Sequence, residues 1–384
     1  MQNSVKNFLP QQYDETDQRP INHNYLSEQF SDYKEILDKI GEVVLKGDFT
    51  LGRAVDEFEK RYADLVGVKH AIGVGSGTDA LFLSLKALGV GEGDEVITTP
   101  FTFYATIGAI VTAGANPVFV DVREDYNIDP DKLEGAITDK TKAILPVHWS
   151  GKPCDMDQIQ SVAKKHNLHI VEDACHAVTA SYKGRNAGTF GSFGCFSMHP
   201  LKNLNVWGDG GVACTNDDEL ANKIRLLRNH GLRDRDHCDI FAYNSRLDTI
   251  QAVVADHLLD KISHITDMRI KNAQYLDDKL SKIDGVTIPP RDIDNVKQVY
   301  HIYSLRFKAR DELQKFLESK GIDAKVHYPI PMHLQPAAKE FGYKQGDFPI
   351  AEGICNTVMS LPVHEFITEE QLEIMVLAIR EFYS

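Results

Sequence analysis

Residues 70–88, HAIGVGSGTDALFLSLKAL, contain the order of elements on which the fold prediction rests. A short apolar run leads into a glycine-rich turn, and apolar residues at helical spacing follow it. This pattern predicts a strand, a tight turn and a helix. Short apolar runs and helical segments continue to alternate up to about residue 230. The alternation predicts an α/β fold, in which helices cover both faces of a mostly parallel sheet.

The pattern changes after residue 248. A long helical segment is followed by a strand–helix–strand unit at residues 299–328 and by an amphipathic helix with Thr368 as its N-cap. We therefore expect a large domain at residues 21–255 and a smaller α+β domain at residues 256–384. Residues 1–20 are polar and contain prolines, and we expect them to form a flexible arm.

The composition excludes several classes of function. The formal net charge of −14 argues against binding to nucleic acid through its phosphates. No apolar run approaches the ~20 residues of a membrane span, and the N-terminus has no apolar segment typical of a secretory signal. The six cysteines form no CxxC pair and no zinc-like spacing, so we expect reduced thiols, no metal site and a cytoplasmic protein.

Three stretches place polar groups where ligands bind in such sheets, at the carboxyl ends of the strands. GVGSGTDAL at residues 73–81 offers backbone amides and a helix N-terminus for an anion, although a purely structural turn would read the same. VEDACHA at residues 171–177 ends a strand in two acids, Glu172 and Asp173, which point to opposite sides. An acid here can pair with a protonated ring nitrogen, or simply cap the next helix.

The third stretch is SMHPLKNLNVWGDGG at residues 197–211, which contains Ser197 and Lys202. Most lysines are solvated, but one held on a loop at a strand end can lose its water, which lowers its pKa and frees the amine for a Schiff base. An anion turn, an acid, and then a serine and a lysine in this order form the arrangement expected for pyridoxal phosphate on an α/β domain.

From about residue 20 to its end, the chain resembles the DegT/StrS family of sugar aminotransferases, which have the fold type I (aspartate aminotransferase-like) architecture of pyridoxal phosphate enzymes. The motifs that carry the resemblance are GSGTDAL, GDEVITTPFTFYAT, VEDACHA, FSMHPLKNLNVWGDGG, YNSRLDTIQA and KVHYPIPMHLQP. The resemblance implies that Lys202 binds the cofactor covalently and moves protons, and that Asp173 pairs with its ring nitrogen. Other residues match cofactor contacts of the family: Gly77, Thr78 and Ser197 for the phosphate, Phe103 and His176 beside the ring, and Asn244 for the phosphate of the partner subunit.

The resemblance also implies a homodimer with shared sites that moves an amino group from L-glutamate to a nucleotide-linked keto-sugar. The NSRLD string resembles that of members that aminate C3, so the resemblance implies a 3-keto-6-deoxy sugar, with amination at C4 as the alternative. A regulator that binds the cofactor is a further alternative; a dehydratase is disfavoured because dehydratases of the family carry histidine in place of Lys202. His327 and Tyr328 match positions that contact the sugar, although packing in the small domain would also explain them. Arg228, His230 and Arg233 could contact a diphosphate, or simply be solvated.

Overall fold

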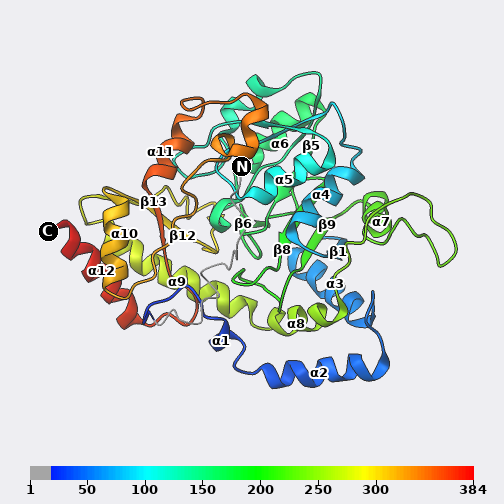
Figure 1. The fold of residues 1–384 in the computed structure, drawn as a ribbon, viewed down its shortest axis with the longest axis horizontal. Helices are drawn as coiled ribbons and strands as arrows, with labels where there is room; N and C mark the ends of the chain where they lie inside the picture. The colour runs from blue at the N-terminus through cyan, green and yellow to red at the C-terminus, as the bar shows by residue number, and fades with distance from the viewer. Residues whose placement is uncertain (1–18) are drawn as a thin grey trace, which may run out of the picture.

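The main sheet has seven strands, and the ends of several of them form the candidate site. The computed structural model describes residues 19–384, so residues 1–18 of the predicted arm lie outside the described residues. The strand order is β1-β9-β8-β5-β4-β2-β3. Figure 1 labels β1, β9, β8 and β5 of this sheet. Only β9 runs antiparallel to its neighbours, which confirms the mostly parallel α/β sheet. The bounds are β1 His70–Val74, β2 Glu95–Thr98, β3 Asn116–Phe119, β4 Thr141–Ile144, β5 His169–Asp173, β8 Phe193–Ser197 and β9 Gly211–Thr215.

Helices cover both faces of this sheet because each strand buries side chains in both directions. Ile72 packs in the apolar cluster that joins α4, α5 and α7, whereas its neighbour Ala71 packs in the cluster of α3 and α8. On the second face, α6 packs against the outer strands through Ile159. The bounds are α3 Arg53–Val66, α4 Gly77–Ala87, α5 Tyr104–Ala113, α6 Met156–His166, α7 Asp218–Leu227 and α8 Thr249–Leu259.

A second, antiparallel sheet organises the C-terminal part, in the order β10-β12-β13. Three helices share its apolar core, and Ile21 near the start of the described chain joins the same core. Thr368 caps the last helix in a capping box with Gln371, as its sequence predicts. The bounds are β10 Val286–Thr287, β12 Tyr303–Phe307, β13 Val358–Leu361, α9 Ile262–Leu280, α10 Arg310–Ser319 and α12 Glu369–Tyr383.

The remaining elements are short or peripheral. A small sheet, β11-β6-β7, connects the two parts, because β11 follows α9 in the chain while β6 and β7 precede α7. No helix among the described residues is long and apolar enough to cross a membrane. The bounds are α1 Leu26–Gln29, α2 Tyr33–Lys46, α11 Pro349–Thr357, β6 Ser181–Tyr182, β7 Arg185–Asn186 and β11 Val296–Lys297.

The strand–helix–strand prediction for residues 299–328 is wrong in its last element. After β12 and α10, the chain makes two isolated bridges, from Ile322 to Ile21 and from Lys325 to Ser360. β13 supplies the third strand of the sheet instead. Pro329 and Pro331 follow directly, and a proline has no N–H to continue a ladder of hydrogen bonds. Residues 325–328 are thereby directed into the cavity described next.

Candidate active site

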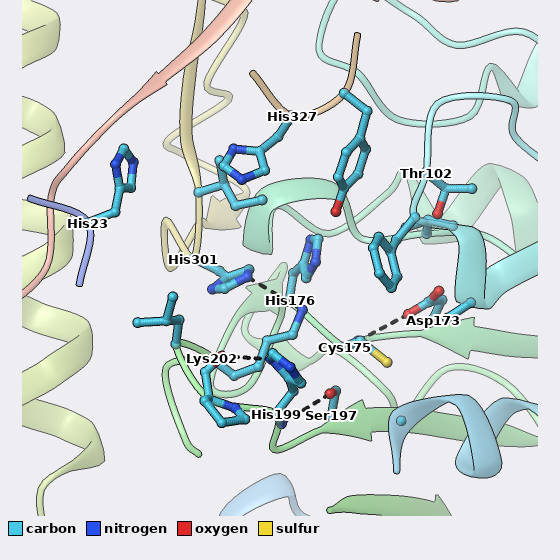
Figure 2. A pocket seen from close by; sticks show the side chains of 18 of the residues that line it. His23, Thr102, Asp173, Cys175, His176, Ser197, His199, Lys202, His301 and His327 are labelled. Carbon is cyan, nitrogen blue, oxygen red and sulfur yellow. Dashed lines mark hydrogen bonds between the residues drawn. The ribbon is translucent and has the colours of Figure 1, made fainter. Parts of the chain in front are cut away.

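The carboxyl ends of β1, β5 and β8 meet at one edge of the main sheet and form one side of a cavity of about 340 Å³. Gly77, Asp173 and Lys202, which the sequence singled out, all line it. Residues of the C-terminal part, including His301 and His327, close the opposite side (Figure 2). The structure therefore brings together groups that are far apart in the chain.

The start of α4 forms one end of the cavity. Ser76 is the N-cap, and its hydroxyl accepts a hydrogen bond from the amide of Asp79 at 3.0 Å. Gly77 follows, and a Cβ at this position would lie 2.6 Å from Cβ of Ser197, so only glycine lets the helix start so close to the end of β8. The first-turn residues Ser76, Gly77 and Thr78 line the cavity. A helix N-terminus at this place suits a phosphate group.

Glu172 and Asp173 point to opposite sides at the end of β5. Glu172 is fully buried, where it accepts hydrogen bonds from the His148 imidazole and from the backbone amides of residues 188, 190 and 191. Asp173 faces the cavity, and its Oδ2 accepts from the hydroxyl of Thr106 at 2.8 Å. Because a carboxylate only accepts, Thr106 must itself accept from the hydroxyl of Thr102, 2.7 Å away. These bonds hold the carboxyl group of Asp173 in place at the edge of the cavity.

Lys202 lies on the loop after β8. Burial lowers the pKa of its amine to about 8, against smaller opposing effects of Cys175 and Asp173. Within the described chain, the hydrogen-bond partner of Nζ is Nε2 of His301 at 3.4 Å. The His301 ring packs on that of His176, with 4.5 Å between ring centroids, and burial together with the Lys202 charge lowers the pKa of both histidines. Of Lys202, His176 and His301, Lys202 is therefore the group that changes its charge near pH 8.

Flat side chains flank the space between these groups. Phe103 is the N-cap of α5, lines the cavity and lies 5.7 Å from the Tyr328 ring between centroids. Tyr328 in turn packs on the buried Trp149. A planar ring with a phosphate, a basic nitrogen and a reactive aldehyde fits this donor set: the ring against Phe103, the phosphate at α4, the ring nitrogen at Asp173 and the aldehyde at Lys202. The residues present thus fit pyridoxal phosphate.

The other predicted site residues lie outside the cavity. Asn244 is exposed and lines a separate hollow with Phe49 and Arg246. The prediction for Arg228 is wrong in both its forms, since the residue is neither solvated nor in the cavity. It is buried, where its guanidinium pairs with Glu59 and donates to the carbonyl of Gly73.

His230 and Arg233 belong to the segment that follows α7. Both are exposed, and neither lines the cavity. Arg233 forms ion pairs with Asp234 and Asp239, at 3.8 and 3.4 Å. In the single chain these two residues are therefore remote from a ligand in the cavity.

Sequence reasoning missed several residues that line the cavity: Thr106, Cys175, His301, His23 and Lys325. Thr106 lies in FTFYAT, which is part of a motif of the family resemblance, but the sequence alone assigns no role to this threonine. Nothing in the local pattern signals His301, because its partner Lys202 lies 99 residues earlier.

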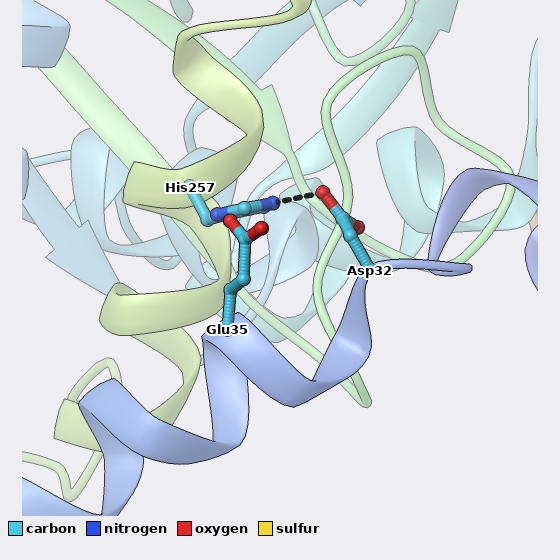
Figure 3. Close-up of side chains that lie close together, drawn as sticks. All are labelled: Asp32, Glu35 and His257. Atoms are coloured by element: carbon cyan, nitrogen blue, oxygen red, sulfur yellow. Dashed lines mark hydrogen bonds and ion pairs between the residues drawn. The ribbon is translucent and has the colours of Figure 1, made fainter.

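A cluster with metal-binding side chains lies away from this cavity, between α2 and α8. Ligand atoms of Asp32, Glu35 and His257 lie within 4.8 Å of one another (Figure 3). The carboxylate of Asp32 already accepts hydrogen bonds from His257 at 2.9 Å and from Lys261 at 2.5 Å. The lysine ammonium supplies the positive charge that a metal ion would otherwise bring.

Known proteins resemble this chain over most of its length. The chain is 44% identical over 361 residues to "Pleiotropic regulatory protein" of Geobacillus stearothermophilus, covering 93% of this chain and 97% of that protein. It is 40% identical over 348 residues to dTDP-3-amino-3,4,6-trideoxy-alpha-D-glucose transaminase of Streptomyces venezuelae, covering 89% and 90%. The solved structure of S. venezuelae DesV in complex with a ketimine intermediate matches with a TM-score of 0.91 and 38% identity, covering 94% and 97%.

The cofactor follows from the same comparisons. Solved structures of similar aminotransferases hold pyridoxal phosphate or its pyridoxamine form. The model of the DegT/DnrJ/EryC1/StrS aminotransferase family matches residues 31–380. The chain belongs to this family of pyridoxal phosphate-dependent aminotransferases.

Proposed function

We propose that the protein transfers an amino group from L-glutamate to C3 of a nucleotide-linked 3-keto-6-deoxy sugar, in the biosynthesis of an amino sugar. The observation that carries the proposal is the buried amine of Lys202 beside Asp173 and the start of α4, whose pKa of about 8 makes the neutral amine far more available near neutral pH than in an ordinary lysine. The name of the S. venezuelae relative, a transaminase of a dTDP-linked 3-amino sugar, supports the sugar and the carbon.

Each group in the cavity has a part in this reaction. When bound, pyridoxal phosphate supplies an electron sink that lets the α-carbon of the amino donor lose its proton. The neutral amine of Lys202 accepts that proton at Nζ and later returns one to the acceptor carbon. Asp173, which Thr106 holds in place, would pair with the protonated ring nitrogen, and the amides at the start of α4 would bind the phosphate. Phe103 lines the cavity, where its side chain would pack against the ring.

Asn244 extends the proposal to the dimer. It is exposed outside its own cavity, as a residue that reaches the phosphate in a partner subunit must be. We therefore propose a homodimer in which each site takes its lysine from one chain and this asparagine from the other.

Alternatives are separated by specific features. Amination at C4 of a 4-keto sugar uses the same residues, so only the product distinguishes it. A dehydratase is disfavoured because Lys202 is present. A regulatory role is kept as a second candidate because the G. stearothermophilus relative carries a regulatory name. Such a regulator would bind the cofactor without turnover.

A substrate panel tests the proposal. The purified holoenzyme is incubated with L-glutamate and dTDP-, UDP- or GDP-linked 3-keto and 4-keto sugars, and release of 2-oxoglutarate is measured. We expect release with a 3-keto sugar and none from Lys202→Ala. Release only with 4-keto sugars would move the reaction to C4, and no release with any keto-sugar would favour the regulator.

A further inference from the structure

The side of the cavity contributed by the C-terminal part presents nitrogen donors to a ligand. His23, Lys325 and His327 line this side, and we call them the donor wall. Figure 2 shows His23 and His327 across the cavity from Asp173. His23 comes from the chain just before α1, and the other two come from the segment after α10.

Each member of the donor wall keeps a donor that the described residues do not use. Nζ of Lys325 lies 2.9 Å from a carboxylate oxygen of Asp323, and an ammonium group has three N–H bonds. Nδ1 of His23 lies 3.4 Å from the same carboxylate, so Nε2 makes no bond to it and can donate to a ligand when the ring carries both protons. Nδ1 of His327 bonds the hydroxyl of Ser360 at 3.1 Å, and burial lowers the pKa of this imidazole to about 3, so the ring is neutral and its Nε2 can donate.

The charges behind the donor wall leave it positive. Asp323 is only 1% exposed and does not line the cavity, and it pairs with the two permanent cations Arg19 and Lys325. The acids that do line the cavity, Asp173 and Asp209, come from the large α/β part. An anion at the donor wall would therefore contact N–H groups directly, while the carboxylate of Asp323 lies behind them and does not line the cavity.

We propose that the donor wall binds the side-chain carboxylate of the amino donor, and so selects a dicarboxylic over a monocarboxylic amino acid. The inference rests on the proposed aminotransferase function. The amine and α-carbon of the donor must lie beside Lys202, and the cofactor takes the space toward Asp173 and α4. The side-chain carboxylate of the amino acid then lies on the remaining side of the cavity, next to His23, Lys325 and His327 of the donor wall.

The test compares Lys325→Met, which removes the charge, with Lys325→Arg, which keeps it. Lys315→Met is the matched control, because Lys315 is exposed on α10 and does not line the cavity. Calorimetry measures binding of glutarate, which has two carboxylates and no amine to react. The first half-reaction is followed separately, without sugar, as the change in cofactor absorbance on addition of L-glutamate or L-alanine.

In Lys325→Met we expect the affinity for glutarate and the rate of reaction with L-glutamate each to fall roughly 10- to 100-fold, because one hydrogen bond to a charged group is lost. L-Alanine should change by less than about twofold, and Lys325→Arg and Lys315→Met should resemble the wild type. If Lys325→Met leaves Asp323 too poorly paired to fold, His23→Leu, which removes the ring nitrogens, is compared with His23→Gln, which keeps an N–H donor; the same loss is then expected only in His23→Leu.

Unchanged glutarate binding and an unchanged preference for L-glutamate in the folded variants would overturn the proposal. Weaker binding of UDP or dTDP with glutarate unaffected would also overturn it, because the donor wall would then serve the diphosphate of the sugar. If no amino acid changes the absorbance of the wild type, the proposed function fails instead, while glutarate binding still tests the donor wall.

Discussion

Replacing Thr106 by valine removes one hydroxyl from the site at almost constant volume. In the native structure this hydroxyl donates to Asp173 over 2.8 Å, and both residues are more than nine-tenths buried. A hydrogen bond to a charged group contributes about 1.5–3 kcal/mol, so the ionised form of Asp173 should lose that stabilisation. At 1.36 kcal/mol per factor of ten, cofactor affinity and turnover should each fall roughly 10- to 150-fold.

The assay is a fluorescence titration of cofactor-free protein with pyridoxal phosphate, together with turnover and thermal unfolding of the same samples. Thr106→Ser keeps the hydroxyl and should stay within a few-fold of the wild type. Thr102 loses its partner in Thr106→Val, so the free energy of unfolding should also fall by about 1–3 kcal/mol. A folded Thr106→Val protein that binds the cofactor and turns over normally would refute the role given to this hydroxyl.

Three further predictions concern other parts of the site. In cofactor-free protein, acylation of Lys202 should rise with a midpoint near pH 8, because its depressed pKa keeps the amine neutral above that pH and protonated below it; a midpoint near 10.5 would contradict the burial argument. Gly77→Ala should lower both thermal stability and cofactor affinity, because the new Cβ would lie 2.6 Å from Ser197; Gly41→Ala, with nothing within 4 Å in the middle of α2, should instead stabilise by about 0.5–1 kcal/mol and leave cofactor binding unchanged. Mixing Lys202→Ala with Asn244→Ala subunits should restore activity at up to about a quarter of the sites if the sites are shared across a two-fold axis; no restoration after subunit exchange would argue against sharing.

Much of the fold was predictable because its elements are encoded locally. The run from His70 to Leu88 contains a strand, a turn and a helix in contiguous sequence, and the end of β5 places Asp173 without reference to distant residues. Parallel strands end at the same edge of a sheet, so the relation of Gly77, Asp173 and Lys202 follows from the alternation alone.

Residues whose role depends on a distant partner could not be predicted. The pairing of Arg228 with Glu59 joins positions 169 apart, and nothing near Arg228 distinguishes it from a solvated arginine. His301 reaches Lys202 only because the C-terminal part folds back over the edge of the main sheet. The segment after Gly321 was predicted as a strand from its apolar residues, whereas its prolines direct it to the cavity.

The attachment of the cofactor tests the central claim most directly. Purified holoenzyme is reduced with borohydride, digested, and examined by mass spectrometry for the peptide that carries the pyridoxyl group. The account predicts a single modified lysine, Lys202, and no such adduct in Lys202→Ala. Modification of a different lysine, or an adduct that survives in Lys202→Ala, would contradict the assignment of this cavity as the active site.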